Sequence, residues 1–199
     1  MKIKLLILLI LLLPIFGGVK NNSAAPNFEL TNQENEAISL GDFKGKKVIL
    51  EWTNHECPFV KRHYDTNNMQ SLQRDAAEDD IVWLSIISSA PKKQGYVSKD
   101  EAKALTDERN AYPSHVLFDE KGDVGRLYDA KTTPHMYLID EQGELKYQGA
   151  IDDLGGTGAL FSSDLTLAKN YIKNALVELA KGIQVTDAKT RPYGCSIKY

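Results

Sequence analysis

The stretch from Ile49 to Tyr64 is the feature that most constrains the fold. An apolar, β-prone run ends in a polar turn, and Cys57-Pro58 then begins a segment with amphipathic helical spacing. Proline is favoured in the first helical turn because its missing N–H would have no partner there. The free backbone N–H groups and the dipole of a helix N-terminus favour an anion and lower the pKa of a nearby thiol. The sequence therefore predicts that Cys57 is a reactive nucleophile at a strand–turn–helix junction.

An inert thiol is the alternative interpretation of Cys57, because free cysteines are often buried as small hydrophobic residues. The neighbouring residues are polar and favour an accessible turn: Asn54, His55, Glu56 and Lys61. The charge of Glu56 opposes a thiolate, whereas Lys61 and Arg62 favour one. This environment favours a reactive thiol over an inert one.

The N-terminal segment has the layout of a secretory signal. Lys2 and Lys4 precede the apolar run Leu5–Phe16, and small residues follow at positions 23–25. The run is shorter than the ~20 residues that a comfortable membrane span needs. We interpret residues 1–25 as a signal peptide, with an uncleaved N-terminal anchor as the alternative. The sequence thus predicts an exported protein, periplasmic or extracellular, that contacts a membrane only through this segment if it is not cut.

Composition and cysteine content limit the possible functions. The chain is 42% hydrophobic, as expected of a globular protein with a full core, and its formal net charge of -3 comes without a basic run. Nucleic acid is therefore not an expected partner. Cys57 and Cys195 are the two cysteines of the chain, and in an oxidising compartment they can form a disulfide. A catalytic pair and a structural staple both remain open at this point.

The pattern of the remaining chain predicts an α/β domain over residues 26–182, followed by a tail at 183–199 that carries Cys195. Apolar runs and turn residues predict an N-terminal hairpin (28–40), central strands (48–52, 81–87, 114–118), a late hairpin (135–140 with 145–150), and helices (58–77 with a break at 65–68, 98–109, 167–182). This order implies a mixed central sheet with helices on both faces.

Thr133-Pro134, directly before the late hairpin, combines with Cys57 into a recognisable pattern. Together they resemble the thioredoxin-fold redoxins, over about residues 26–199. In that family the Thr-Pro pair is a cis-proline loop that faces the active-site thiol. The run from Cys57 to Tyr64 and the terminal Arg191–Ser196 are similar to exported redoxins of the peroxiredoxin (alkyl hydroperoxide reductase/thiol-specific antioxidant) superfamily. The resemblance implies a thioredoxin-like fold and a thiol-dependent oxidoreductase without a cofactor.

The chain departs from both family patterns. Thioredoxins use Cys-x-x-Cys, of which Asn54-His55-Glu56-Cys57 keeps only the second cysteine. Peroxiredoxins use Pro-x-x-x-Thr-x-x-Cys, and here Leu50 replaces the proline and Asn54 the threonine. The Asn54 amide can still donate a hydrogen bond. An arginine that activates peroxide must come from outside the motif, and Arg109 and Arg126 are weak candidates for it.

The resemblance and the residues together give a mechanism as a hypothesis. The Cys57 thiolate attacks a peroxide or a disulfide, Cys195 resolves the product, and an external thiol reductant resets the pair. The predicted site residues are Cys57, Cys195, Asn54, Thr133 and Pro134. The alternatives are thiol–disulfide exchange with protein substrates, a non-catalytic module stapled by the two cysteines, and a copper-binding module using His55, Cys57 and His135.

Overall fold

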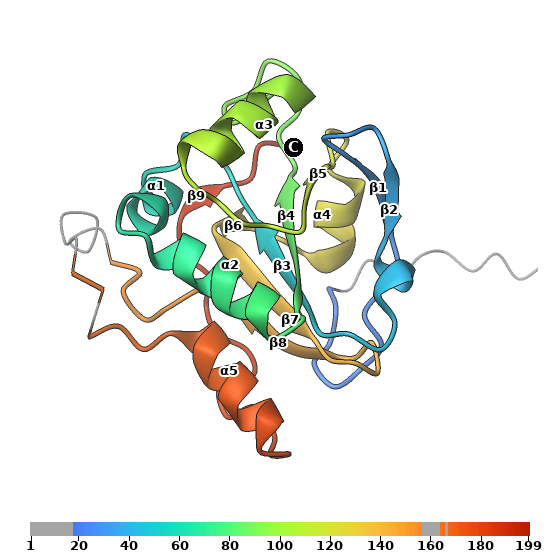
Figure 1. Cartoon of the computed structure of the whole chain (residues 1–199), viewed down its shortest axis with the longest axis vertical. Helices are drawn as coiled ribbons and strands as arrows, with labels where there is room; N and C mark the ends of the chain where they lie inside the picture. The colour runs from blue at the N-terminus through green and yellow to red at the C-terminus, as the bar shows by residue number, and fades with distance from the viewer. Residues whose placement is uncertain (1–17, 157–163, 166) are drawn as a thin grey trace, which may run out of the picture.

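The computed structural model describes residues 18–156, 164–165 and 167–199. The apolar run of the predicted signal peptide lies outside the described residues. The centre of the domain is a seven-stranded mixed sheet of order β2-β1-β5-β4-β3-β7-β8, with helices packed on both of its faces (Figure 1). This confirms the predicted thioredoxin-like α/β fold.

The sheet combines parallel and antiparallel pairs. Strands β3 and β4 pair in parallel, as do β4 and β5, whereas β3–β7, β7–β8, β1–β2 and β1–β5 are antiparallel. The N-terminal hairpin therefore extends the central sheet. The strands are β1 (Glu29–Asn32), β2 (Ala37–Ser39), β3 (Val48–Trp52), β4 (Val82–Ile87), β5 (His115–Phe118), β7 (His135–Ile139) and β8 (Leu145–Gly149).

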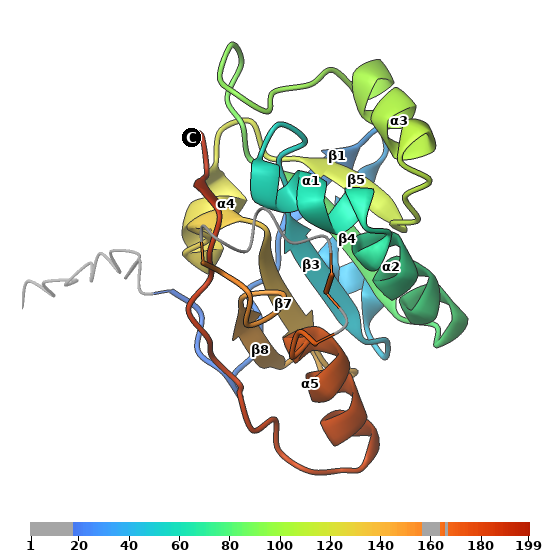
Figure 2. The same ribbon diagram turned by 90° about the vertical axis from the view of Figure 1, so that its left-hand side faces the viewer.

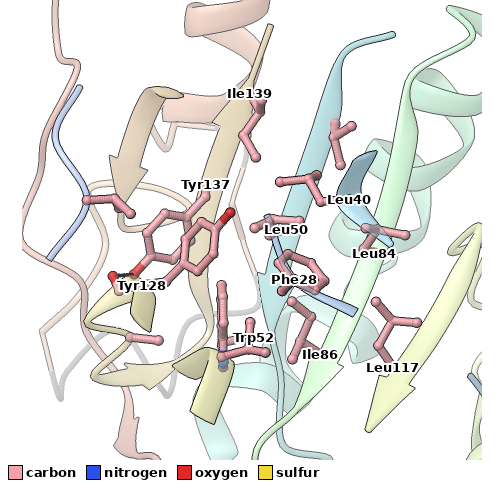
Figure 3. Close-up of a cluster of buried hydrophobic side chains, with 14 of the residues drawn as sticks. Phe28, Leu40, Leu50, Trp52, Leu84, Ile86, Leu117, Tyr128, Tyr137 and Ile139 are labelled. Atoms are coloured by element: carbon pink, nitrogen blue, oxygen red, sulfur yellow. Dashed lines mark hydrogen bonds between the residues drawn. The ribbon is translucent and has the colours of Figure 1, made fainter. Parts of the chain in front are cut away.

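The two faces of the sheet carry separate hydrophobic clusters. Helices α1, α2, α3 and α5 cover one face, and α4 covers the other (Figure 2). Trp52, Tyr128 and Tyr137 pack edge to face and tilted on the α4 side, with Leu50 and Phe28 beside them (Figure 3). The helices are α1 (Pro58–Asp65), α2 (Asn68–Glu78), α3 (Lys99–Glu108), α4 (Asp123–Tyr128) and α5 (Tyr171–Ala180), with a 3₁₀ turn η1 (Leu40–Phe43).

Local chemistry explains where the helices begin and end. The predicted break falls at Asn67, whose φ of 58° separates α1 from α2. Ser98 forms a capping box with Glu101 at the start of α3. Gly182, with φ of 69°, follows the C-cap of α5. Helix α4 was not predicted, because its six residues are too few to show a helical period.

The segment preceding the predicted domain packs against β8. Val19 is buried in the core on the α4 side, and the backbones of Asn22 and Ala25 hydrogen-bond to the β7–β8 hairpin. Residues 20–26 thus cover one edge of the sheet. A cut after Ala25 would remove this edge partner of β8. Within the described ranges, no helix is both long and apolar enough to cross a membrane.

The C-terminal tail runs back from α5 across the edge of the domain to the end of the sheet that carries Cys57 (Figure 2). Near its end, β9 (Cys195–Ser196) pairs antiparallel with β6 (Thr132–Thr133). The tail also bonds to β8, where the Thr190 N–H donates to the Gln148 carbonyl and the Gln148 N–H donates to the Ala188 carbonyl. These contacts return Cys195 to the domain.

Candidate active site

Cys57 lies at the junction of β3 and α1, as the sequence predicts. It is the N-cap residue of α1, Pro58 occupies the first helical turn, and the Cys57 side chain has no exposed surface. A backbone hydrogen bond from the Cys57 N–H to the Asn54 carbonyl closes the turn before the helix. The thiol therefore lies at a helix N-terminus, but it is buried and does not lie on the accessible turn that the sequence favoured.

The tail supplies the second thiol directly beside Cys57. Cys195 is in register with Thr133 across the β6–β9 pair, and the Cys57 Sγ donates a hydrogen bond of 3.0 Å to the Thr133 carbonyl. The Thr133–Pro134 peptide is cis. Four predicted site residues, Cys57, Cys195, Thr133 and Pro134, thus meet at one place, and both cysteines are free thiols here.

Gly194 permits this close approach. Its φ is 128°, a backbone conformation that residues other than glycine rarely adopt. A Cβ at this position would also collide with the Thr133 carbonyl. Only glycine lets the tail backbone lie flat on the cis-proline loop at this position. The residue before Cys195 is therefore part of the site's geometry.

The two thiols have opposite pKa shifts. Burial acts to raise the pKa of Cys57, but hydrogen bonding to its sulfur from the Cys195 side chain and from the Val60 and Cys195 backbones lowers it below its ordinary value. Burial, followed by the hydrogen bond with Cys57 and the charge of Cys57, raises the pKa of Cys195 to about 12. Cys57 is thus the sulfur that ionises first, and Cys195 acts as its hydrogen-bond donor.

Asn54 shapes the turn instead of facing the sulfur. Its Oδ1 accepts the Glu56 N–H at 2.9 Å, and its Nδ2 donates to the Gln94 carbonyl at 3.4 Å. Its side chain also packs on Gly95, where a Cβ would overlap with it. These contacts make Asn54 a brace between the Cys57 turn and the loop before α3.

The two candidate arginines lie in different places. Arg109 donates from Nη2 to the His55 carbonyl at 3.0 Å and stacks over Tyr64 at 5.0 Å, so it supports the turn before Cys57. Arg126 contacts Tyr199 and the Lys121 carbonyl, on α4. Arg109 therefore supports the turn before Cys57 through the His55 carbonyl and the Tyr64 ring.

The three candidate copper ligands are not brought together. His55 lines a cavity of about 50 Å³ between α3 and the sheet. Nδ1 of His135 accepts from the Lys131 N–H, and burial lowers the pKa of His135 to about 3. Over residues 18–156, 164–165 and 167–199, no three side chains of metal-ligating type cluster as a metal site would require.

Sequence reasoning missed a buried polar network beside the cysteines. The Tyr193 hydroxyl donates to Asp152 Oδ1 at 2.6 Å and lies 3.0 Å from His63 Nε2 and 3.3 Å from Arg62 Nη2. Arg62 therefore faces Asp152 and Tyr193, and not the Cys57 sulfur as its charge suggested. In the sequence, the network was visible only as Tyr193, two positions before Cys195, and as the neighbouring Arg62 and His63 on α1.

Glu51 is a second residue that the sequence did not single out. It has no exposed surface and accepts hydrogen bonds from Trp83 Nε1 and Ser85 Oγ, both at 2.9 Å, and from Tyr64 Oη at 3.2 Å. Its place in an apolar strand gave no hint of this cluster. These hydrogen bonds satisfy the Glu51 side chain, so β3 can place it in the core on the α1 side.

Known proteins are similar to this domain in both fold and sequence. The AhpC/TSA family model matches residues 22–148. The thioredoxin-like protein YneN of Bacillus subtilis is 29% identical over 130 residues, covering 65% of this chain and 71% of its own length. The chloroplastic peroxiredoxin Q of rice (Oryza sativa subsp. japonica) is 26% identical over 143 residues, covering 67% and 60%.

A solved structure resembles nearly the whole chain. An uncharacterized conserved protein from Geobacillus kaustophilus superposes with a TM-score of 0.76 at 27% identity, covering 90% of this chain and 92% of its own. The family match ends at residue 148, so the tail with Cys195 lies beyond it. The fold, the matched region and the Cys57 junction lead to one conclusion: the chain belongs to the AhpC/TSA family and is a thiol-dependent oxidoreductase.

Proposed function

We propose that this protein is an exported, peroxiredoxin-like oxidoreductase in which Cys57 is the nucleophile and Cys195 the resolving cysteine. The observation that carries the proposal is the position of Cys195, in register with the residue whose carbonyl accepts the Cys57 Sγ hydrogen bond. The pKa of Cys57 is lowered while that of Cys195 is raised, which fits the assignment of the two roles.

The proposed cycle has three balanced steps. The Cys57 thiolate attacks the distal oxygen of a hydroperoxide, which gives a Cys57 sulfenic acid and releases an alkoxide or hydroxide that takes up a proton. The Cys195 thiol then displaces water from the sulfenic acid and forms the Cys57–Cys195 disulfide. Two equivalents of an external thiol reduce this disulfide by exchange and leave as their own disulfide.

Access to the thiol favours a small oxidant. Cys57 has no exposed surface, and the backbone edge of Thr132 and Thr133 is already paired with the tail. A protein disulfide would have to displace the tail to reach Cys57 along this edge, whereas a hydroperoxide needs only a small opening. The likeness to a peroxiredoxin from rice supports the same direction.

Thiol–disulfide exchange is the second candidate function. It is favoured by the hydrogen bonds of Asn54 and Arg109, whose donors are directed at the Gln94 and His55 carbonyls. A donor set for peroxide is therefore not assembled from these two residues. The likeness to a thioredoxin-like protein supports this alternative.

The N-terminal sequence supports the export part of the proposal. Two lysines, an apolar run and small residues form a signal layout. An oxidising compartment would make a two-cysteine couple functional. Fractionation of cells that produce the full chain, followed by mass determination of the mature N-terminus, tests export and cleavage together.

Stopped-flow oxidation tests the proposed activity. The reduced protein is mixed with hydrogen peroxide, the fluorescence of the buried tryptophans Trp52 and Trp83 is followed, and the products are assigned by mass. We expect fast formation of a Cys57–Cys195 disulfide in the wild type and a trapped sulfenic acid in Cys195→Ser. Cys57→Ser is the matched control and should not react in the fast phase.

Two results would change the proposal. Oxidation no faster than that of a free thiol would exclude the peroxidase, and small and protein disulfides would then be tested as oxidants. A Cys57–Cys195 disulfide that resists reduction, with a potential below about −300 mV, would indicate a structural staple.

A further inference from the structure

The residue that ties the tail to the helix of Cys57 is Tyr193. Its hydroxyl contacts Asp152, His63 and Arg62, and its ring packs on Phe59 with centroids 5.5 Å apart. Three of these four partners belong to α1, the helix that begins at Cys57. The tail segment before Cys195 is thus fastened to the same helix whose first turn holds the other sulfur.

The protonation of this network is defined by its donors and acceptors. Asn68 Nδ2 lies 2.9 Å from His63 Nδ1, so the other ring nitrogen of His63 carries the hydrogen that points to the Tyr193 hydroxyl. Burial, with the charge of Arg62, lowers the pKa of His63 to about 3, so the ring is neutral. Burial and the carboxylate of Asp152 raise the pKa of Tyr193, which keeps its proton and donates it to Asp152.

The network is closed to solvent on several sides. Arg62, His63 and Asp152 are each less than 10% exposed. The loop after β8 covers the tyrosine ring, since a Cβ on Gly155 would overlap with it. Hydrogen bonds in such surroundings are stronger than at the surface, and a buried charged acceptor such as Asp152 makes them stronger still.

From this geometry we propose that Tyr193 is the positioning residue of the Cys57–Cys195 couple. Its bond to Asp152 fixes the direction of the tail, Gly194 then lies on the Thr133 carbonyl, and Cys195 arrives beside Cys57. The proposal rests on the proposed function, in which the two thiols react with each other. Tyr193 acts through the tail and does not touch the reacting sulfurs.

Two measurable properties follow from this role. Holding Cys195 at Cys57 raises the effective concentration of one thiol at the other, which favours the disulfide. It also keeps the Cys195 side chain and N–H within hydrogen-bonding reach of the Cys57 sulfur, which lowers the pKa of Cys57. A purely structural tyrosine would affect the stability of the fold without changing either property.

The test uses Tyr193→Phe, which keeps the ring packing and removes only the hydroxyl. The matched control is Tyr199→Phe in the same tail, because the Tyr199 hydroxyl bonds at 2.8 Å to the Ala130 carbonyl and not to α1. Each protein is equilibrated with glutathione and glutathione disulfide, so that two protein thiols are oxidised as one glutathione disulfide becomes two glutathiones. The disulfide fraction is read by mass, and the pKa of Cys57 by thiolate absorbance.

We expect Tyr193→Phe to weaken the disulfide at least tenfold, equivalent to ~30 mV for a two-electron couple, and to raise the pKa of Cys57 by about one unit. Tyr199→Phe should stay within about twofold of the wild type. Asp152→Asn, which keeps an acceptor but removes its charge, should shift both readings in the same direction by a smaller amount. It serves as the second variant if Tyr193→Phe folds poorly.

The outcomes separate this proposal from the function on which it rests. If the wild type forms the Cys57–Cys195 disulfide and Tyr193→Phe matches it in both readings, the positioning role is wrong. It is equally wrong if Tyr199→Phe shows the same change, because any loosening of the tail would then suffice. If the wild type forms no such disulfide in any glutathione mixture, the proposed two-cysteine function fails first.

Discussion

Thr133 faces Cys195 across the β6–β9 pair, and its carbonyl oxygen also accepts the hydrogen bond of Cys57 Sγ. One backbone unit therefore contacts both cysteines. Their separation is defined by strand pairing, which is far more rigid than a free tail.

Gly194→Ala should separate the two thiols. The new Cβ would collide with the Thr133 carbonyl, so β9 cannot pair with β6 and Cys195 moves away. We expect disulfide formation after one equivalent of oxidant to slow by at least tenfold, measured by mass in quenched samples. Gly182→Ala is the control, because Gly182 also has positive φ but a Cβ there meets nothing within 4 Å. Equal rates in the two variants would contradict the close approach.

The two thiols should titrate in separate steps. The pKa of Cys57 is lowered and that of Cys195 is raised to about 12, so the first thiolate to appear belongs to Cys57. Cys195→Ala removes a hydrogen-bond donor from the thiolate and should move the first step to higher pH. Thiolate absorbance, taken as the difference from Cys57→Ala, measures it. A first step that is unchanged in Cys195→Ala would show that Cys195 does not stabilise the thiolate.

Asn54→Ala should weaken both the fold and the thiol site. It removes the acceptor for the Glu56 N–H and the donor to Gln94, at a cost of roughly 1–2 kcal/mol in unfolding free energy. Asp140→Ala is the control, because Asp140 Oδ1 accepts two backbone N–H groups in the β7–β8 turn in the same manner. Urea unfolding should show comparable losses. Only Asn54→Ala should slow the oxidation of Cys57, and a slowing in both variants would point to general destabilisation.

Mild acid should destabilise the protein through His63 and His135. Burial is the main cause that lowers both pKa values to about 3, whereas the unfolded value is 6.5. The unfolded state therefore binds more protons between these limits, and this stability, complete above pH 6.5, is lost as the pH falls towards 3. At pH 5 each histidine should account for about 2 kcal/mol. Urea unfolding at pH 7 and pH 5 measures it, and His135→Gln should reduce the difference by about half. Equal stability at both pH values would refute the prediction.

The order of elements and the place of Cys57 could be predicted from the sequence. The β-branched run of β4, the Cys57-Pro58 helix start and the Ser98 capping box are local signals, and local signals survive in the fold. The cis peptide at Thr133-Pro134 matches what the family resemblance implied. The roles of the predicted site residues remain predictions that the proposed experiments test.

The contacts between distant segments could not be predicted. Asp152 and Tyr193 are hydrogen-bonded, but neither belongs to a motif whose spacing indicates a partner. Glu51 is buried because β4 and α1 supply donors to its side chain, and none of these donors is next to it in the sequence. The charge of Arg62 suggested help for the thiolate, but the buried Asp152 attracts it instead. In each of these three cases the position of the polar side chain depends on a partner that is distant in the sequence, and local patterns do not show that partner.

The pairing of β9 with β6 also links the redox state of the protein to its resistance to unfolding. A Cys57–Cys195 bond would close a loop that contains most strands of the sheet. Closing a loop of more than about 100 residues lowers the conformational entropy of the unfolded chain and so raises its free energy by roughly 5 kcal/mol. By thermodynamic linkage, folding must then favour formation of the disulfide by the same free energy. Heat, denaturant or a destabilising mutation far from the sulfurs would thus make the oxidised form easier to reduce.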